Sequence, residues 1–218
     1  MSEIQVKLKD GKILKLPQGS TVLDVAKTIS QGLARNALSG EVNGELVDLR
    51  YPLQEDSEVN MLTFDDEGGR YAFWHTSTHI MAQAVRRLYP ETKLAIGPPI
   101  AEGFYYDFDR ETPFTEDELR AIEAEMQKII KENPEIIRYT KPREEALQYE
   151  RDNDAPYKEE LIRDLPEDET ISYYQQGEFI DLCAGPHMQD MKPIKAIRLT
   201  SIAGAYWRGD ENKQMLTR

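Results

Sequence analysis

The residues best suited to acid–base or metal chemistry in this 218-residue chain lie in two short motifs. All three histidines and the only cysteine fall in His75-Thr-Ser-Thr-His79 and Cys183-Ala-Gly-Pro-His187. Each motif pairs two chemically active side chains at a spacing of four residues. Side chains that served only packing would be scattered along the chain. The concentration therefore predicts one site to which both motifs contribute.

The first motif is predicted to lie on a helix. Between residues 71 and 88 the apolar side chains recur at helical spacing and centre on one side. His75 and His79 stand one turn apart on nearly the opposite side. We therefore predict that neither imidazole points into the core of its own helix. Isolated histidines are usually surface or core residues, but a second Cys/His pair elsewhere favours a shared site.

The second motif is predicted to follow a strand. The segment Glu178-Phe-Ile-Asp-Leu is typical of a strand end, and Gly185-Pro186 favours a turn. A strand that delivers Cys183 and a turn that delivers His187 could converge on the helix with the other pair. Three imidazoles and a thiolate suit tetrahedral zinc.

Two catalytic alternatives follow from these residue types. HxxxH on a helix is half of many zinc sites, but a thermolysin-like peptidase needs a glutamate where this chain has Thr76. Such a peptidase is therefore disfavoured. A Cys183 nucleophile with a histidine base is formally possible, although lone buried cysteines are more often inert.

Residues 1–64 predict a small β-grasp-like unit. Alternating apolar residues on either side of Asp10-Gly11 predict a hairpin, and Asn43-Gly44 predicts a second tight turn. An amphipathic helix with Ser20 or Thr21 as its cap lies between them, and residues 59–64 supply a last strand. No catalytic constellation occurs here, so a structural or docking role is expected.

The polar, glycine-bearing residues 65–69 predict a linker, and residues 70–218 a second domain. A helix at 116–132 opens with Thr115 and Glu118 in capping-box register, and its acidic residues predict a solvated face. Shorter helices are expected at 143–151 and 157–164. Strands are expected around Gly97–Asp109 and, in antiparallel arrangement, over 171–210.

Together these motifs strongly resemble the amino-terminal region of bacterial threonyl-tRNA synthetases. The resemblance rests on the HxxxH helix, the segment at 95–109, the Cys-x-x-x-His turn and the closing segment Ala-Gly-Ala-Tyr-Trp-Arg-Gly-Asp at 203–210. It implies an α+β chain with a TGS-type, ubiquitin-like β-grasp domain at 1–64 and a linker at 65–69. An editing domain with an antiparallel sheet and the HxxxH helix would follow at 70–218.

The resemblance implies a proofreading function. A site that accepts threonine cannot easily refuse serine, because one methyl group is worth only about 1–3 kcal/mol in a pocket. A second site that is too small for threonine must then hydrolyse the seryl ester of Ser-tRNA(Thr) to serine and tRNA(Thr). We expect such an aminoacyl-tRNA ester hydrolase to lack ligase activity, because the aminoacylation core is not in this sequence.

By motif match, the resemblance implies His75 as the general base or water-orienting residue. His79, Cys183 and His187 would shape the same pocket. The related alanyl-tRNA synthetases are associated with zinc at this site, whereas the threonyl family implies hydrolysis without an obligatory metal. We therefore expect no required cofactor, with zinc as a possible occupant of these four side chains.

The resemblance assigns further residues of the second domain. Lys158, in Tyr-Lys-Glu-Glu-Leu, would stabilise developing charge or place water. Asp181 would orient a neighbour or hold the substrate amino group, and Tyr106 and Gly97 would bind substrate. Many relatives carry a basic residue directly after the cysteine, but this chain has Ala184, so no phosphate contact is expected there.

Composition limits the partners. The net charge of −13 counts against autonomous tRNA binding, and one cysteine excludes an internal disulfide. The absence of a long apolar run or signal peptide predicts a cytoplasmic protein without membrane contact. The expected partners are the serine-bearing acceptor end of tRNA(Thr) and the remainder of a synthetase, itself a homodimer. A free-standing trans-editing deacylase and a non-catalytic RNA-binding module are the alternatives.

Overall fold

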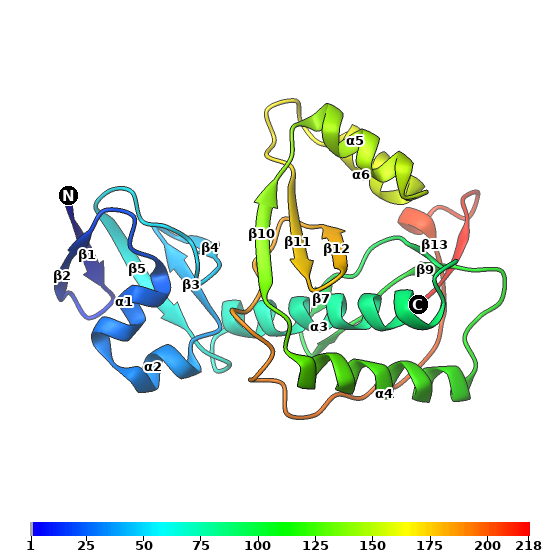
Figure 1. The fold of residues 1–218 in the computed structure, drawn as a ribbon, viewed down its shortest axis with the longest axis horizontal. Helices are drawn as coiled ribbons and strands as arrows, with labels where there is room; N and C mark the ends of the chain where they lie inside the picture. The colour runs from blue at the N-terminus through cyan, green and yellow to red at the C-terminus, as the bar shows by residue number, and fades with distance from the viewer. Residues whose placement is uncertain (1) are drawn as a thin grey trace. The chain divides into compact units, whose positions relative to one another are not determined.

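The computed structural model describes residues 2–218, and the chain divides into two compact units (Figure 1). The first unit comprises Met1–Thr76 and Gly185–Pro193, and the second comprises Ser77–Ala184 and Ile194–Arg218. Helix α3 (Glu67–Leu88) begins in the first unit and ends in the second. The domain boundary predicted at residues 65–69 stays a prediction.

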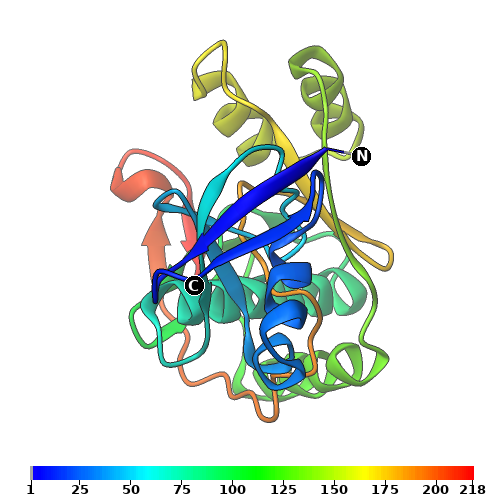
Figure 2. The same cartoon turned by 90° about the vertical axis from the view of Figure 1, so that its left-hand side faces the viewer.

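The first unit is built on a five-stranded sheet in the order β2-β1-β5-β3-β4. Its strands are β1 (Glu3–Leu8), β2 (Ile13–Pro17), β3 (Ser39–Val42), β4 (Glu45–Val47) and β5 (Ser57–Leu62). Strands β1 and β5 pair in parallel, and the other neighbours pair antiparallel. Helices α1 (Val22–Ile29) and α2 (Gln31–Asn36) accompany the sheet (Figures 1 and 2). This confirms the predicted β-grasp fold.

Local signals explain the turns of this unit. Asn43 and Gly44 have φ values of 50° and 86°, as a primed hairpin turn requires. In the first hairpin only Gly11 has a positive φ, of 85°, and its N–H donates to the carbonyl oxygen of Leu8, so this hairpin forms without a primed turn. Thr21 caps α1 in a reciprocal capping box with Asp24. The predicted hairpins and cap are therefore confirmed.

The last strand of the first unit ends earlier than predicted. Strand β5 stops at Leu62, because Asp66 accepts hydrogen bonds from the backbone N–H of Thr63 at 2.8 Å and from its hydroxyl at 3.2 Å. These bonds turn the chain into α3. The core that the strands share consists of Ile4, Val6, Leu8, Val22, Val25, Ala37, Val42, Leu49, Leu53 and Val59.

The second unit combines helices with small antiparallel sheets. Its helices after α3 are α4 (Glu116–Glu132), α5 (Arg143–Asp152) and α6 (Pro156–Asp164). One sheet has the order β10-β11-β12, with β10 (Ile136–Thr140), β11 (Ser172–Gln176) and β12 (Phe179–Leu182). A second has the order β13-β14-β9-β6, with β13 (Gly204–Tyr206), β14 (Met215–Thr217), β9 (Phe108–Asp109) and β6 (Lys93–Leu94). Strands β7 (Pro99–Ile100) and β8 (Gly103–Phe104) form a third, and the α+β class is confirmed.

Helix α4 begins where the sequence predicted, but one of its acidic residues is not exposed as predicted. Thr115 and Glu118 form the capping box, and Leu119, Ile122, Met126 and Ile129 are buried. Glu125 is buried as well, at 9% exposure, although the acidic residues were predicted to be solvated. A cationic partner on another helix, Arg87, accounts for this exception.

Helix α3 is enclosed on nearly every side. All residues at positions 75–85 are buried, so the expected contrast between an apolar side and an open side is absent there. The polar side chains of this stretch find partners within the protein. The Thr76 hydroxyl donates to the carbonyl oxygen of Ala72 at 2.8 Å, and the Gln176 amide donates to Gln83 at 2.8 Å. Burial of polar groups is tolerated when they are hydrogen-bonded.

The prediction of antiparallel strands over 171–210 is only partly right. Strands β11 and β12 pair antiparallel, and β13 pairs with β14, but residues 183–203 contain no regular element. Proline removes a ladder hydrogen bond, and Pro186 and Pro193 both fall in this stretch. Among the helices of residues 2–218, none has the length and apolarity needed to cross a bilayer.

Candidate functional site

The most concentrated polar network of the second unit joins Lys158, Asp181 and Tyr106. The ammonium nitrogen of Lys158 lies 2.8 Å from Oδ1 of Asp181 and donates to the hydroxyl oxygen of Tyr106 at 3.2 Å. The Tyr106 hydroxyl donates to Oδ2 of Asp181 at 2.9 Å. His79 Nε2 lies 3.7 Å from the same carboxylate oxygen. Three residues predicted for the site thus surround the carboxylate of a fourth, Asp181.

This network is almost completely withdrawn from solvent. Lys158 and Asp181 are each 5% exposed, and Tyr106 is 1% exposed. Burial by itself raises the pKa of the Asp181 carboxyl, but the charges of Lys158 and His79 and the hydrogen bonds that it accepts bring the pKa below its usual range. Burial, and then the Asp181 charge, raises the pKa of Tyr106 well above its ordinary value. At neutral pH the site therefore holds an ionised carboxylate and a neutral phenol.

Several elements bring these side chains together. Lys158 lies in the first turn of α6, Asp181 on β12 and His79 on α3, while Tyr106 stands between β8 and β9. Gly97 faces the Tyr106 ring, and a Cβ added at this glycine would lie 2.1 Å from a ring carbon. Gly97 therefore lets the backbone approach the ring that hydrogen-bonds Asp181.

A second pair of predicted site residues meets in the first unit. The rings of His75 and His187 stack with their centroids 4.4 Å apart and an interplanar angle of 28°. His75 is 9% exposed and His187 is fully buried. The Tyr71 ring meets His75 edge-on, with ring centroids 5.4 Å apart. Both imidazoles are therefore held by neighbouring rings.

The four ligand-type residues form a possible metal-binding group. His75, His79, Cys183 and His187 each offer one donor atom. Three imidazoles and one thiol are a donor set that zinc accepts. Cys183 is only partly buried, so its sulfur is not locked in an apolar core. The group is compatible with zinc, as the sequence predicted.

A cavity of about 360 Å³ adjoins the Lys158–Asp181 pair. Its wall also includes Glu150 on α5 and two basic side chains, Arg86 and Lys93. Glu150 is 4% exposed and accepts a hydrogen bond from the Tyr173 hydroxyl at 2.7 Å. Burial raises the pKa of Glu150 to about 7, and the Asp181 charge adds to this rise.

Glu150 makes stability depend on pH. Its pKa rises from 4.5 to about 7 on folding, so the folded state holds a proton that the unfolded state has lost between these values. Stability therefore declines as the pH rises through this window. We expect Glu150→Gln, which keeps an acceptor for Tyr173, to remove the decline. At pH 8 its free energy of unfolding should exceed that of the wild type by on the order of 3 kcal/mol, and at pH 4.5 the two should agree.

Urea denaturation at pH 4.5 and pH 8 measures this difference. Glu145→Gln is the matched control, because Glu145 lies on the same helix with its side chain 61% exposed. The control should track the wild type at both pH values. A decline in Glu150→Gln as steep as that of the wild type would contradict the assignment.

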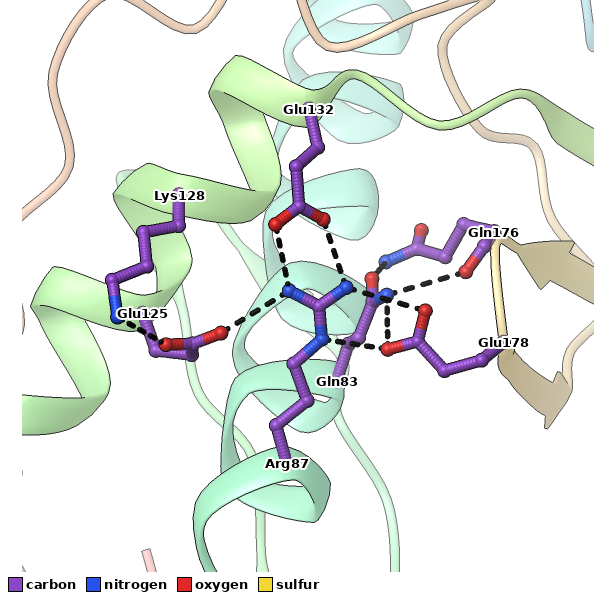
Figure 3. A network of polar contacts seen from close by, with 7 residues as sticks. All are labelled: Gln83, Arg87, Glu125, Lys128, Glu132, Gln176 and Glu178. Atoms are coloured by element: carbon purple, nitrogen blue, oxygen red, sulfur yellow. Dashed lines mark hydrogen bonds and ion pairs between the residues drawn. The ribbon is translucent and has the colours of Figure 1, made fainter.

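An arginine-centred network ties α3 to α4 and β12 in the second unit (Figure 3). Arg87 donates to Glu178 at 2.6 Å, to Glu125 at 3.1 Å and to Glu132 at 2.8 and 3.1 Å. The hydrogen bond from Arg87 lowers the pKa of Glu178 to about 2. Glu178 directly precedes β12, which carries Asp181. The network therefore fixes the strand that supports the buried pair.

Sequence reasoning did not identify Glu150 or Arg87. A signal for Glu150 existed, because it falls three and four residues after Leu147 and Ala146 on the apolar stripe of a helix. Arg87 gave no such signal, since its three partners come from two other segments of the chain.

Comparisons with known proteins agree with this architecture. A family model described as "TGS domain" matches residues 4–63, and one described as "Threonyl and Alanyl tRNA synthetase second additional domain" matches residues 171–218. The chain is 59% identical, over 99% of its length, to the threonine–tRNA ligase of Acetivibrio thermocellus, of which it covers 34%. The corresponding ligases of Desulforamulus reducens and Clostridium perfringens are 56% and 55% identical over the same share of the chain, which covers 34% and 33% of them.

The chain thus spans about a third of the length of the curated relatives it matches. It carries a TGS domain and a synthetase second additional domain, and along 99% of its length it resembles part of the threonyl-tRNA synthetases, so the resemblance inferred from its motifs is confirmed.

Proposed function

We propose that this chain hydrolyses the ester bond of Ser-tRNA(Thr), releasing serine and tRNA(Thr). The second additional domain and the synthetase relatives support a tRNA-related proofreading role. We propose this substrate, the hydrolysis of its ester and the residue roles given below. We also propose that the protein is cytoplasmic and that its partners are tRNA(Thr) and the remaining parts of a homodimeric synthetase.

The buried Lys158–Asp181 pair is the observation that carries the proposal. An ion pair withdrawn from water gives little net stability, because desolvation offsets the attraction between the charges. A buried ion pair on the wall of a cavity is therefore a candidate functional site. Asp181 Oδ1 lies 2.8 Å from the Lys158 ammonium nitrogen and orients it, and the Tyr106 hydroxyl donates to the second carboxylate oxygen.

Ester hydrolysis needs a base for water and positive charge for the oxyanion. In the proposed reaction, water attacks the carbonyl carbon of the seryl ester. The bond from that carbon to the ribose oxygen breaks, and His75 passes the proton from water to the departing ribose oxygen. Lys158 stabilises the negative charge that develops on the carbonyl oxygen.

The size of the cavity is consistent with a small aminoacyl group as the substrate moiety. Its volume of about 360 Å³ lies near the lower end of the range for small-molecule sites. Gly97 and Tyr106 are proposed to bind the aminoacyl group beside this cavity, because the Tyr106 hydroxyl donates to Asp181, which lies on the cavity wall. The discrimination between threonine and serine, which differ by one methyl group, is part of the proposal.

No metal is assigned a step in the proposed reaction. The three imidazoles and the Cys183 sulfur could hold zinc, which would then polarise the carbonyl or activate water. We propose that hydrolysis proceeds without it. His79, Cys183 and His187 then shape the pocket around His75.

The decisive experiment compares two esters side by side. We expect the chain, or a threonine–tRNA ligase that contains it, to hydrolyse Ser-tRNA(Thr) faster than Thr-tRNA(Thr) by about tenfold or more, because one methyl group is worth about 1–3 kcal/mol. Loss of radiolabelled amino acid from each charged tRNA, at equal enzyme concentration, measures the ratio. Equal rates for both esters would refute the size discrimination, and no hydrolysis of either by the ligase would refute the proposed function.

A further inference from the structure

The turn that follows β4, residues 48–51, is held in place by backbone hydrogen bonds in the first unit. The backbone N–H of Tyr51 donates to the carbonyl oxygen of Asp48 at 3.1 Å, and Leu49 between them is 1% exposed in the core. The backbone N–H groups of Val22 and Leu23 donate to the carbonyl oxygens of Tyr51 and Leu49. These N–H groups open α1 and have no partner within the helix. The turn is therefore fixed by both the core and α1.

Two side chains of this turn hold the segment that carries His187. Oδ1 of Asp48 accepts a hydrogen bond from the backbone N–H of His187 at 2.8 Å. Arg50 Nη2 donates to the carbonyl oxygens of Met188 at 2.8 Å and of Gln189 at 3.3 Å. Arg50 Nη1 lies 3.2 Å from Oδ1 of Asp48. An aspartate and an arginine thus bind three consecutive residues through their backbone.

The contacts matter because this segment has no regular structure of its own. Buried backbone groups outside helices and sheets need side-chain partners. Thr76 supplies one more, since its hydroxyl oxygen accepts from the backbone N–H of Met188 at 2.9 Å. Asp48 is 6% exposed, and a hydrogen bond to a buried carboxylate is among the stronger kinds.

We infer that Asp48 and Arg50 are positioning residues for His187, so that the β-grasp domain takes part in setting the geometry of hydrolysis. Their contacts fix the backbone from which the His187 ring extends onto the ring of His75, 4.4 Å away between centroids. This inference rests on the proposed function, in which His75 is the base. A small displacement of His187 would leave His75 without its stacked neighbour.

Asp48→Ala tests the inference, because it removes the oxygen that accepts from His187. We expect kcat for Ser-tRNA(Thr) hydrolysis to fall about 10- to 100-fold, the cost of misplacing a group by about 1 Å, with KM little changed. Asp48→Asn keeps an acceptor oxygen and should restore most of kcat. If Asp48 served only the stability of the fold, kcat would fall in each variant in proportion to the fraction of unfolded protein.

Asp56→Ala is the matched control. It removes an aspartate from the same unit whose Oδ1 also accepts a backbone N–H, at 2.7 Å, but the donor is Gln5 on β1 and not the segment that carries His187. It should leave kcat at the wild-type value. Equal losses of kcat in Asp56→Ala and Asp48→Ala would overturn the inference, as would Asp48→Asn at the rate of Asp48→Ala.

The wild type separates this inference from the proposed function. If it hydrolyses Ser-tRNA(Thr) and Asp48→Ala does so at the same rate, the inference alone fails. If the wild type hydrolyses neither ester within the full ligase, the proposed function fails and the inference fails with it.

Discussion

His75→Ala should slow hydrolysis of Ser-tRNA(Thr) by about 100- to 10,000-fold, the contribution of a positioned general base. His75 suits this role because it is 9% exposed, so a little of its surface still meets solvent, and because its ring is held by His187 and Tyr71. Single-turnover hydrolysis of preformed Ser-tRNA(Thr) measures the effect on the chemical step. Circular dichroism should show an unchanged melting profile for a variant that acts on water rather than on folding.

Leu88→Ala serves as the control on the same helix. Leu88 is the last residue of α3 and is 37% exposed, so its removal changes the helix but not the histidines. Its rate should match that of the wild type. A wild-type rate of hydrolysis in His75→Ala would show that His75 is not the general base.

Chelation of metal from the wild-type protein tests whether His75 acts as a general base or as a metal ligand. Hydrolysis should survive thorough chelation, with elemental analysis reporting the metal content of the same sample. Loss of activity that stoichiometric zinc restores would make His75 a metal ligand, and the group with His79, Cys183 and His187 a zinc site.

The first unit was predictable because its signals are local. Asn43-Gly44 accepts the positive φ angles that a primed turn needs, and Thr21 with Asp24 caps the following helix within four residues. Alternating apolar residues then assign the strands to one buried face. Each of these features can be recognised in a window shorter than one element.

Helix α3 was harder because it is buried nearly all round. Periodicity identifies a helix that has one apolar side and one solvated side. Residues 75–85 are all buried, and the polar ones satisfy each other inside, as Gln83 does with Gln176. The sequence therefore shows a helix but misjudges its surroundings.

The candidate site was only partly predictable from residue types. Rare histidines and a single cysteine mark themselves by their spacing, whereas Lys158 has the pattern of an exposed helix residue and was found only by resemblance. Its partners Tyr106 and Asp181 lie 52 and 23 residues away in sequence. Asp48 was not found at all, because its partner His187 is 139 residues distant. Contacts at such separations leave no periodic trace.

Lys158→Met should reduce both activity and stability. Removal of one partner from a buried ion pair costs about 3–5 kcal/mol, because the remaining charge is left buried without compensation. Under the proposed mechanism, loss of the positive group assigned to the oxyanion should also slow hydrolysis by about 100- to 1,000-fold. Lys128→Met is the control, since the Lys128 side chain is 67% exposed and its partner Glu125 also pairs with Arg87.

The pH dependence of the stability of Lys158→Met should identify Asp181 as the source of its instability. In the wild type the pKa of Asp181 is held below its usual value of 3.8, so its stabilising effect is present above that value and lost as the pH falls. Without Lys158, burial is the larger influence and the pKa should rise. The folded state of Lys158→Met then favours the protonated acid, so the contribution of Asp181 to stability should decline as the pH rises from 4 to 8. That trend is opposite in sign to the contribution of Asp181 in the wild type.

Adding Asp181→Asn to Lys158→Met should separate folding from catalysis. The double variant has no buried charge at this position, and the amide oxygen of the introduced asparagine would still accept from Tyr106, so most of the free energy of unfolding should return. The hydrolysis rate should not return, because no cation is restored. Urea denaturation and single-turnover hydrolysis of the four proteins in this cycle give both quantities. Recovery of the rate together with stability would mean that Lys158 serves folding alone, and the proposed role of its charge in the reaction would be withdrawn.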